Sequence, residues 1–188
     1  MMEDTSKGGA AVDTNANTSA RDPKQPMQLH IDYASEAKYS PGRRTFFKYR
    51  NLGVEAASNG RARGYQNTSI AGMLDSTGWH YHECDFQFVY LLKGELILEF
   101  EDGTVHHLSQ GDSMFIPGGL RHNEIYVSED KDSIEFSMPE KIGTVPVERP
   151  AHLPAVLKPM GNVEKVRAKM AAEQSAFAQA AAKAAKAA

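Results

Sequence analysis

The chain has 188 residues, which predicts one domain with terminal segments to spare. Its formal net charge of −3 gives no reason to expect nucleic acid or an anionic membrane as a partner. A single cysteine, Cys84, excludes an internal disulfide framework and suits a reducing compartment. The N-terminus carries Glu3 and Asp4 and no apolar run, and no segment is apolar enough to span a membrane. We therefore expect a soluble, cytoplasmic protein.

The first 40 residues are predicted to form a flexible arm. They are rich in Ser, Thr, Asn, Asp, Gly and Ala, and such a segment cannot bury enough apolar surface to order itself. We expect disorder to about residue 26 and a more apolar arm from Met27 to Tyr33. This region contains no amphipathic helix, which argues against a regulator with an N-terminal DNA-binding module.

Residues 41–142 read as an all-β domain. Short β-branched and aromatic runs alternate with turn residues, which is typical of an antiparallel sandwich or barrel. The Asp102-Gly103 pair predicts a tight hairpin with a type I′ turn. Residues 54–60 are expected to form a short helical turn or a loop. The predicted strands cover residues 45–49, 61–73, 86–92, 95–101, 105–108, 114–116, 125–127 and 133–138.

The strand at residues 86–92 predicts two different faces. If Gln87 points inward, Val89 and Leu91 do so too, and the remaining side chains point outward. The outward set is aromatic, namely Phe86, Phe88 and Tyr90. An exposed patch of this kind is costly, so it packs against an N-terminal element or against a second copy. We favour a homodimer.

Residues 143–188 are expected to wrap around or extend from the barrel. Four prolines between residues 146 and 159 predict an extended segment. After Gly161-Asn162, apolar residues recur at helical spacing, and the helix ends in an Ala-rich stretch with two lysines over residues 180–188. A solvated helix explains this tail better than a weak contact with nucleic acid.

Three histidines form the most informative pattern. His80 and His82 are two residues apart on a predicted strand and so share a face, and His122 follows a Pro-Gly-Gly turn. The two surrounding segments resemble the paired motifs of the cupin superfamily. The matching positions are His80, His82, Gly94, Gly111, Pro117, Gly119 and His122. The resemblance implies a jelly-roll barrel, the double-stranded β-helix of cupins, in which the three histidines hold a metal.

Two motif positions depart from the family pattern. The position of the family's Glu holds Gln87, and the position of its Asn holds Tyr126. Gln87 offers a neutral amide oxygen, either as a fourth ligand or as a residue that only hydrogen-bonds a neighbour. With four neutral donors, a divalent ion keeps its full charge, which favours an anionic, chelating substrate and disfavours a base at this position. Tyr126 is expected either to donate a proton in the cavity or to cap the barrel.

The resemblance also suggests the reaction. Three-His centres without the Glu resemble β-diketone-cleaving dioxygenases that use Fe(II), and the His/Gln set resembles manganese-binding cupin hydroxynitrile lyases. We expect one divalent metal per chain, with Fe(II) the first candidate and Mn, Ni or Zn the alternatives. A non-catalytic small-molecule-binding barrel remains the competing hypothesis. Secondary candidates near the site are Cys84, Glu83, Asp85 and Arg121.

Overall fold

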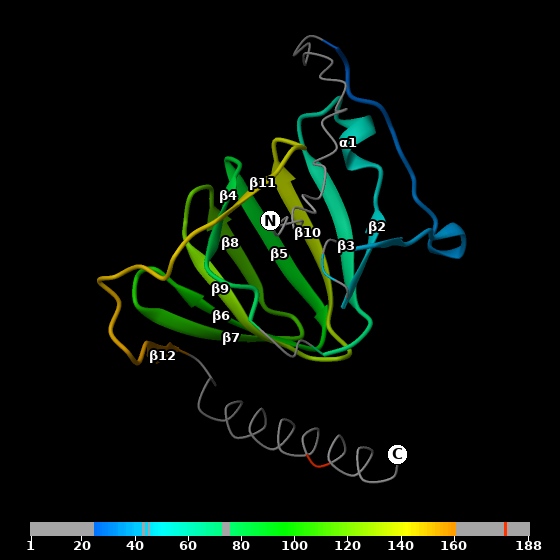
Figure 1. The fold of residues 1–188 in the computed structure, drawn as a ribbon. Helices are drawn as coiled ribbons and strands as arrows, with labels where there is room; N and C mark the ends of the chain where they lie inside the picture. The colour runs from blue at the N-terminus through cyan, green and yellow to red at the C-terminus, as the bar shows by residue number, and fades with distance from the viewer. Residues whose placement is uncertain (1–24, 43, 45, 73–75, 161–178, 180–188) are drawn as a thin grey trace, which may run out of the picture.

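The computed structural model describes residues 25–42, 44, 46–72, 76–160 and 179. In these residues the protein is a β-barrel made of two six-stranded sheets (Figure 1). Its helical elements there are a 3₁₀ turn, η1 (Ala34–Glu36), and one α-helical turn, α1 (Val54–Ala57). No helix in this part of the chain is long and apolar enough to cross a bilayer. The predicted all-β jelly roll is confirmed.

The first sheet, sheet A, has the order β1-β2-β3-β10-β5-β8. Each neighbouring pair in it is antiparallel. In this sheet β3, from the start of the barrel, pairs with β10, so segments that are distant in sequence lie side by side. Their bounds are β1 (Ser40–Pro41), β2 (Phe47–Asn51), β3 (Arg63–Ser69), β10 (Asp132–Met138), β5 (Phe86–Lys93) and β8 (Ser113–Pro117).

The second sheet, sheet B, has the order β11-β4-β9-β6-β7-β12. Its two edge strands follow residue 142, where we expected the barrel to end, and β12 pairs with β7 in parallel. The proline-rich segment therefore contributes to the sheet. The bounds are β11 (Gly143–Pro146), β4 (His80–Glu83), β9 (His122–Val127), β6 (Glu95–Phe100), β7 (Thr104–Ser109) and β12 (Lys158–Met160).

The β6–β7 hairpin differs from the predicted type I′ turn. A type I′ turn requires positive φ at both central residues. Gly103 has φ +87°, but Asp102 is not at positive φ, and Asn59 is the one such non-glycine residue in the described ranges. Instead, Asp102 Oδ1 accepts hydrogen bonds from the backbone N–H and the hydroxyl of Thr104. The type I′ prediction was wrong because the Asp side chain caps a longer loop that needs one left-handed residue.

Two apolar clusters hold the barrel together. The first lies between the sheets and consists of Phe47, Val89, Leu91, Leu96, Leu98, Leu108 and Val127. This confirms the inward orientation predicted for Val89 and Leu91. The second cluster lies on the outer face of sheet B, where Leu153 and Leu157 of the wrapping segment cover Ile97, Val105, Tyr126 and Trp79. Burial of apolar surface on this second face of sheet B stabilises the packing of the segment after β10 against the barrel.

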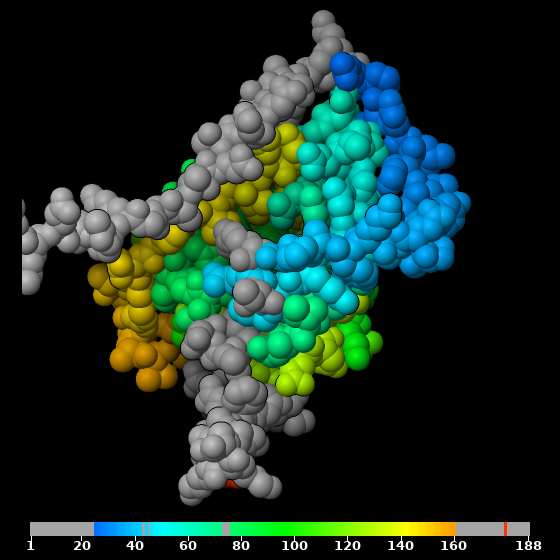
Figure 2. All heavy atoms as spheres, turned by 45° about the vertical axis from the view of Figure 1, so that its right-hand side comes forward, coloured from blue at the N-terminus to red at the C-terminus, as the bar shows by residue number. Residues whose placement is uncertain are grey.

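The described part of the N-terminal arm runs along the surface beside α1 and β2 (blue in Figure 2). The Gln28 N–H donates to the Ala57 carbonyl at 2.8 Å, and Asp32 forms an ion pair with Arg50 at 2.6 Å. The arm keeps large side chains exposed, including Met27 and Leu29. Residues 1–24 and the predicted helix after residue 162, apart from Gln179, lie outside the described residues.

Candidate metal centre

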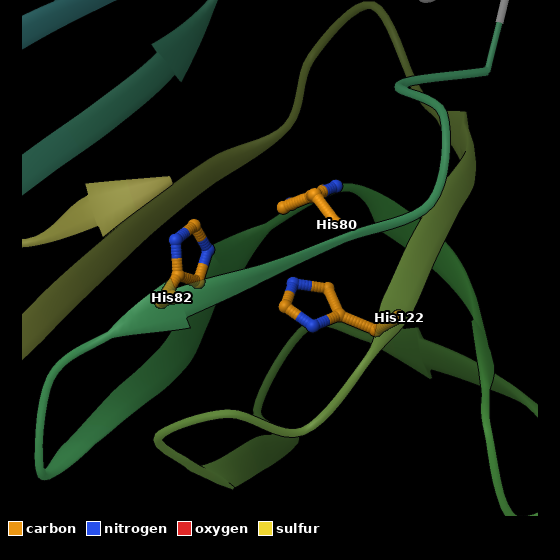
Figure 3. A group of neighbouring side chains, drawn as sticks. All are labelled: His80, His82 and His122. Atoms are coloured by element: carbon orange, nitrogen blue, oxygen red, sulfur yellow. The ribbon is translucent and has the colours of Figure 1, made fainter. Parts of the chain in front are cut away.

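The three histidines converge inside the barrel. His80 and His82 project from β4, and His122 begins β9 directly opposite His80 in the register. One ring nitrogen from each residue lies within 4.8 Å of the others. Figure 3 shows the three rings turned toward one another, and His80 and His122 are buried at 6% and 2% exposure. The convergence that the resemblance to cupins implied is therefore present.

A tight loop contact brings His122 to the pair. The Gly118 N–H donates to the Asp85 carbonyl and the Gly119 N–H to the His82 carbonyl, both at 3.0 Å. A Cβ atom on Gly118 would lie 1.6 Å from the Cys84 carbonyl oxygen, so a side chain cannot fit there. The Pro-Gly-Gly turn thus docks the β8–β9 loop on the β4–β5 loop and sets the separation of the histidines.

The backbone fixes which nitrogen of each ring can bind a metal. Nδ1 of His80 lies 2.8 Å from the Gly78 carbonyl, and Nδ1 of His122 lies 2.9 Å from the Leu120 carbonyl. Nδ1 of His82 lies 3.3 Å from the Gly143 carbonyl and 3.1 Å from the Thr144 hydroxyl. A carbonyl only accepts, so Nδ1 carries the proton and Nε2 presents its lone pair. This arrangement fits a transition metal.

Burial keeps His122 in the form that ligates. Burial, with a smaller contribution from the nearby His80, lowers the pKa of His122 to about 4, and the hydrogen bond to the Leu120 carbonyl opposes the change. The imidazole is therefore neutral at physiological pH, and no proton has to leave before a metal binds.

A cavity of about 300 Å³ opens beside the histidines. His80 and His82 contribute to one wall, and Gln87 of β5 faces the same space. Two arginines, Arg44 and Arg63, also line it. The structure thus brings Gln87 together with the histidine group, as the motif comparison predicted. Gln87 Nε2 donates to Glu135 Oε2 at 3.4 Å, so its hydrogen-bonding partner is a carboxylate.

The structure does not bring Tyr126 to this cavity. A register shift in the β6–β9 pairing between Ile97 and Leu98 places Tyr126 opposite Ile97 and Glu124 opposite Leu98. Tyr126 is consequently buried in the outer cluster with Trp79 and Leu153. The extra residue of this β-bulge reverses the alternation after Glu124, and a period-two reading of the strand cannot foresee it.

Two carboxylates that the sequence reasoning missed line the cavity, Glu124 and Glu135. Glu124 lies two residues after His122 on β9, which is a usable signal for a shared face. Glu135 lies two residues from each of the buried Ser133 and Ser137 on β10, so the three side chains share one face. Small polar residues at alternate positions of a strand are a second signal for an inward face. Neither Glu124 nor Glu135 is a motif position, so the family pattern did not point to them.

The secondary candidates lie away from the histidine group. Glu83 is exposed at the end of β4, and Arg121 pairs with Glu101 at 3.7 Å. Cys84 follows β4, and burial, reinforced by Asp85 and opposed by Arg63, raises the pKa of its thiol. A raised pKa makes a thiol a poorer metal ligand and nucleophile.

Comparison with known proteins agrees with this geometry. Residues 72–133 match the family model described as the cupin domain. The matched segment contains the strands from β4 to β9 and all three histidines. A separate comparison with curated proteins found no match.

Two solved structures have a fold similar to that of this chain. The polyketide cyclase RemF from Streptomyces resistomycificus is 18% identical with a TM-score of 0.51, over 68% of this chain and 89% of that chain. KdgF from Halomonas sp. is 19% identical with a TM-score of 0.50, over 60% of this chain and 96% of that chain. At these identities the likeness concerns the fold alone.

Proposed function

We propose that this cupin is a metal-dependent enzyme acting on a small anionic or enolisable molecule. The observation that carries the proposal is the convergence of the three histidine rings, each with its Nδ1 beside a backbone carbonyl that leaves Nε2 free to ligate. A divalent metal held by His80, His82 and His122 would act as a Lewis acid and, as Fe(II), would supply redox chemistry toward oxygen.

The cavity supports this substrate class. The guanidinium groups of Arg44 and Arg63 line it and would attract an anion. Arg44 Nη2 donates to the Thr77 carbonyl at 2.7 Å, and Arg63 stacks over the Tyr65 ring at 4.7 Å, so both groups are held in place. Phe47 and Tyr49 cover the side toward the apolar core and limit the entry of water.

The first candidate reaction is oxidative cleavage of a C–C bond in a β-diketone-type substrate by a non-haem Fe(II) dioxygenase. Neutral imidazole donors favour this choice because they leave the ion's charge available for an enolate with two oxygens. Arg44 or Arg63 would orient the charged substrate, and the confined cavity would exclude bulk water.

A second candidate is a redox-neutral lyase using Mn or Zn, of the hydroxynitrile-lyase type. The carboxylates of Glu124 and Glu135 in the cavity favour it, because they give the site groups able to accept a proton. A redox-neutral elimination needs such an acceptor and no oxidant. A non-catalytic binding barrel is the outcome if neither reaction occurs.

Elemental analysis of protein purified without added metal or chelator tests the proposal. About one iron per chain, followed by oxygen uptake with 1,3-dicarbonyls, supports the dioxygenase. Manganese or zinc with oxygen-independent turnover supports the lyase. Ligand binding by metal-loaded protein without turnover of either substrate class leaves a binding module, and absence of metal uptake on reconstitution contradicts the metal-dependent enzyme.

We also propose that the partner of this chain is a second copy of itself. The outer face of sheet A carries a cluster of apolar side chains, which we call the aromatic face. It consists of Phe86, Phe88, Tyr90, Leu92, Phe115, Ile134, Phe136 and Met138. Phe86 and Phe115 stack at 5.0 Å, and Phe115 is 60% exposed. A self-complementary apolar patch of this kind suits a two-fold homodimer.

A further inference from the structure

Glu135 occupies an unusual position inside the barrel. It lies on β10, beside the β5 strand that carries Gln87, and its carboxylate faces the histidine-lined cavity. Its Oε1 accepts a hydrogen bond from Asn67 Nδ2 at 2.8 Å and from the Ser133 hydroxyl at 3.4 Å. Lys131 Nζ lies 3.7 Å from the same oxygen. These donors hold one carboxylate oxygen in place and leave Oε2 for Gln87.

The carboxylate determines how the Gln87 amide is turned. An ionised carboxylate accepts hydrogen bonds and cannot donate them, whereas the Gln amide has one accepting oxygen and one donating NH₂. Gln87 Nε2 therefore faces Glu135 Oε2, at 3.4 Å. The amide is planar, so the part of Gln87 left to face a ligand in the cavity is its carbonyl oxygen.

We propose that Glu135 is a positioning residue for the metal site, which turns the carbonyl oxygen of Gln87 toward the space in front of the histidines. This inference rests on the proposed metal-dependent function. Without Glu135 the amide could present either its oxygen or its NH₂, and an NH₂ group cannot ligate a cation. Partners of this kind orient metal ligands from outside the coordination sphere.

Lys131 makes the arrangement compatible with a buried carboxylate. Its side chain is 3% exposed, its Nζ lies 4.9 Å from the Phe47 ring centroid, and it donates to the Asn67 carbonyl at 3.5 Å. An isolated charge in such a place is costly, and the opposite charge of Glu135 offsets the cost. Burial lowers the pKa of Lys131, and the carboxylate of Glu135 opposes this change. With Lys131 protonated the pair has no net charge, so Glu135 orients Gln87 without cancelling the charge of a bound metal.

The chain contains a matched pair on the opposite face of β10. Gln66 Nε2 donates to Asp132 Oδ2 at 2.8 Å, and Asp132 also accepts from the Thr68 hydroxyl. Neither Gln66 nor Asp132 lines the histidine cavity. Replacing Asp132 with Asn therefore makes the same chemical change in an equivalent Gln–carboxylate pair that cannot reach the metal.

The experiment compares the full-length wild type with Glu135→Gln, Glu135→Asp and Asp132→Asn. Two-dimensional NMR follows the side-chain NH₂ resonances of Gln87 in metal-free protein. Titration with Co(II) then gives the metal affinity and the visible absorption spectrum. We expect slowly exchanging Gln87 NH₂ protons in the wild type, and shifted, faster-exchanging ones in Glu135→Gln. We also expect about tenfold or greater loss of Co(II) affinity and an altered Co(II) spectrum.

Two comparisons separate positioning from general stability. Asp132→Asn should keep the wild-type Co(II) spectrum and affinity, and Glu135→Asp should recover part of the loss. Wild-type Co(II) affinity and spectrum in folded Glu135→Gln would overturn the proposal. If that variant does not fold, unprotected Gln87 NH₂ protons in the wild type would overturn it equally.

Together, the NMR of the metal-free protein and the Co(II) titration distinguish failure of the proposed metal-dependent function from failure of the Glu135 positioning role. If the wild type binds no Co(II) while its Gln87 amide is held by Glu135, the proposed metal-dependent function fails and the hydrogen bond has another purpose. If Co(II) binds and the Gln87 amide is indifferent to Glu135, the proposed function stands and the positioning assignment fails.

Discussion

His80 and His122 lie directly opposite each other across β4 and β9, with their ring centroids 4.4 Å apart. The opposition depends on pairing between two segments that are about forty residues apart in sequence. Each ring is also fixed by a carbonyl two residues before it in the chain. The ligand geometry is therefore a property of the backbone, which makes single-residue tests of the site informative.

Replacing His122 with Ala should reduce metal occupancy sharply. His122 is 2% exposed, and it supplies one of the three ring nitrogens that lie within 4.8 Å of one another. Its loss therefore leaves two protein ligands and an open coordination position. Elemental analysis after dialysis against trace metal measures the effect. His152→Ala is the control, because that exposed ring bonds the Glu101 carbonyl away from the group. Stoichiometric metal in His122→Ala would exclude the three-His assignment.

The stability of the metal-free protein should fall as the pH is lowered from about 6.5 to 4. His122 has a pKa of about 4 in the fold against 6.5 for the ordinary group, so the unfolded chain binds the proton first. Stability due to this group is complete above pH 6.5 and is lost toward pH 4, by about 3 kcal/mol in total. Urea unfolding at several pH values measures it. His122→Gln should flatten this part of the profile; an identical slope in that variant would assign the effect to other groups.

Replacing Gln87 with Glu should weaken the binding of an anionic chelator to the metal-loaded protein by about tenfold or more. The change adds a negative charge beside the cavity and places two carboxylates next to each other at Glu135. Calorimetric titration with a 1,3-dicarbonyl enolate measures it. Gln110→Glu adds the same charge in an exposed turn and should have little effect. Equal affinities in all three proteins would remove Gln87 from the surroundings of the metal.

Substituting Gly118 with Ala should damage the site more than the same change at Gly119. A Cβ at Gly118 would meet the Cys84 carbonyl oxygen at 1.6 Å, whereas one at Gly119 meets nothing within 4 Å and only strains a φ of +80°. We expect about 1–2 kcal/mol of destabilisation for Gly119→Ala. Gly118→Ala should show a larger loss together with weaker metal binding. Thermal unfolding and metal titration of both variants test this, and equal effects would contradict the loop-docking argument.

Replacing Phe115 with Lys should convert the proposed dimer into a monomer. The charge would enter the aromatic face on the edge strand β8, beside Phe86, where a second copy would have to desolvate it. Light scattering coupled to size-exclusion chromatography reports the mass. Val156→Lys is a matched control, since Val156 is 72% exposed outside this face. A wild-type protein that is monomeric at high concentration would disprove the homodimer.

Local spacing in the sequence predicted the strands of the barrel and the shared face of His80 and His82, and the resemblance to cupins added His122. Two histidines at alternate positions share a face in any strand, and Gly118 and Gly119 mark a loop that can approach another closely. The inward direction of Val89 and Leu91 followed from the same alternation. These features require no knowledge of which strands pair.

The remainder of the site depends on pairing, which alternation alone does not reveal. The bulge on β9 changes the face of Tyr126, and it is visible only when β6 and β9 are aligned. Glu135 reaches the cavity because β10 lies beside β5, although the two residues that meet, Gln87 and Glu135, are far apart in sequence. The same holds for β11 and β12, because the prolines predicted an extended segment that wraps or links and did not show which strands it pairs with.

The segment between β11 and β12 has a practical consequence for anyone who shortens this chain. Leu153 and Leu157 cover Ile97, Val105 and Tyr126 on sheet B, and β12 protects the edge of β7. A fragment that ends at residue 142 would expose this apolar surface together with an unpaired strand edge, and both promote aggregation. Expression trials, domain fusions and crystallisation fragments should therefore extend at least through Met160.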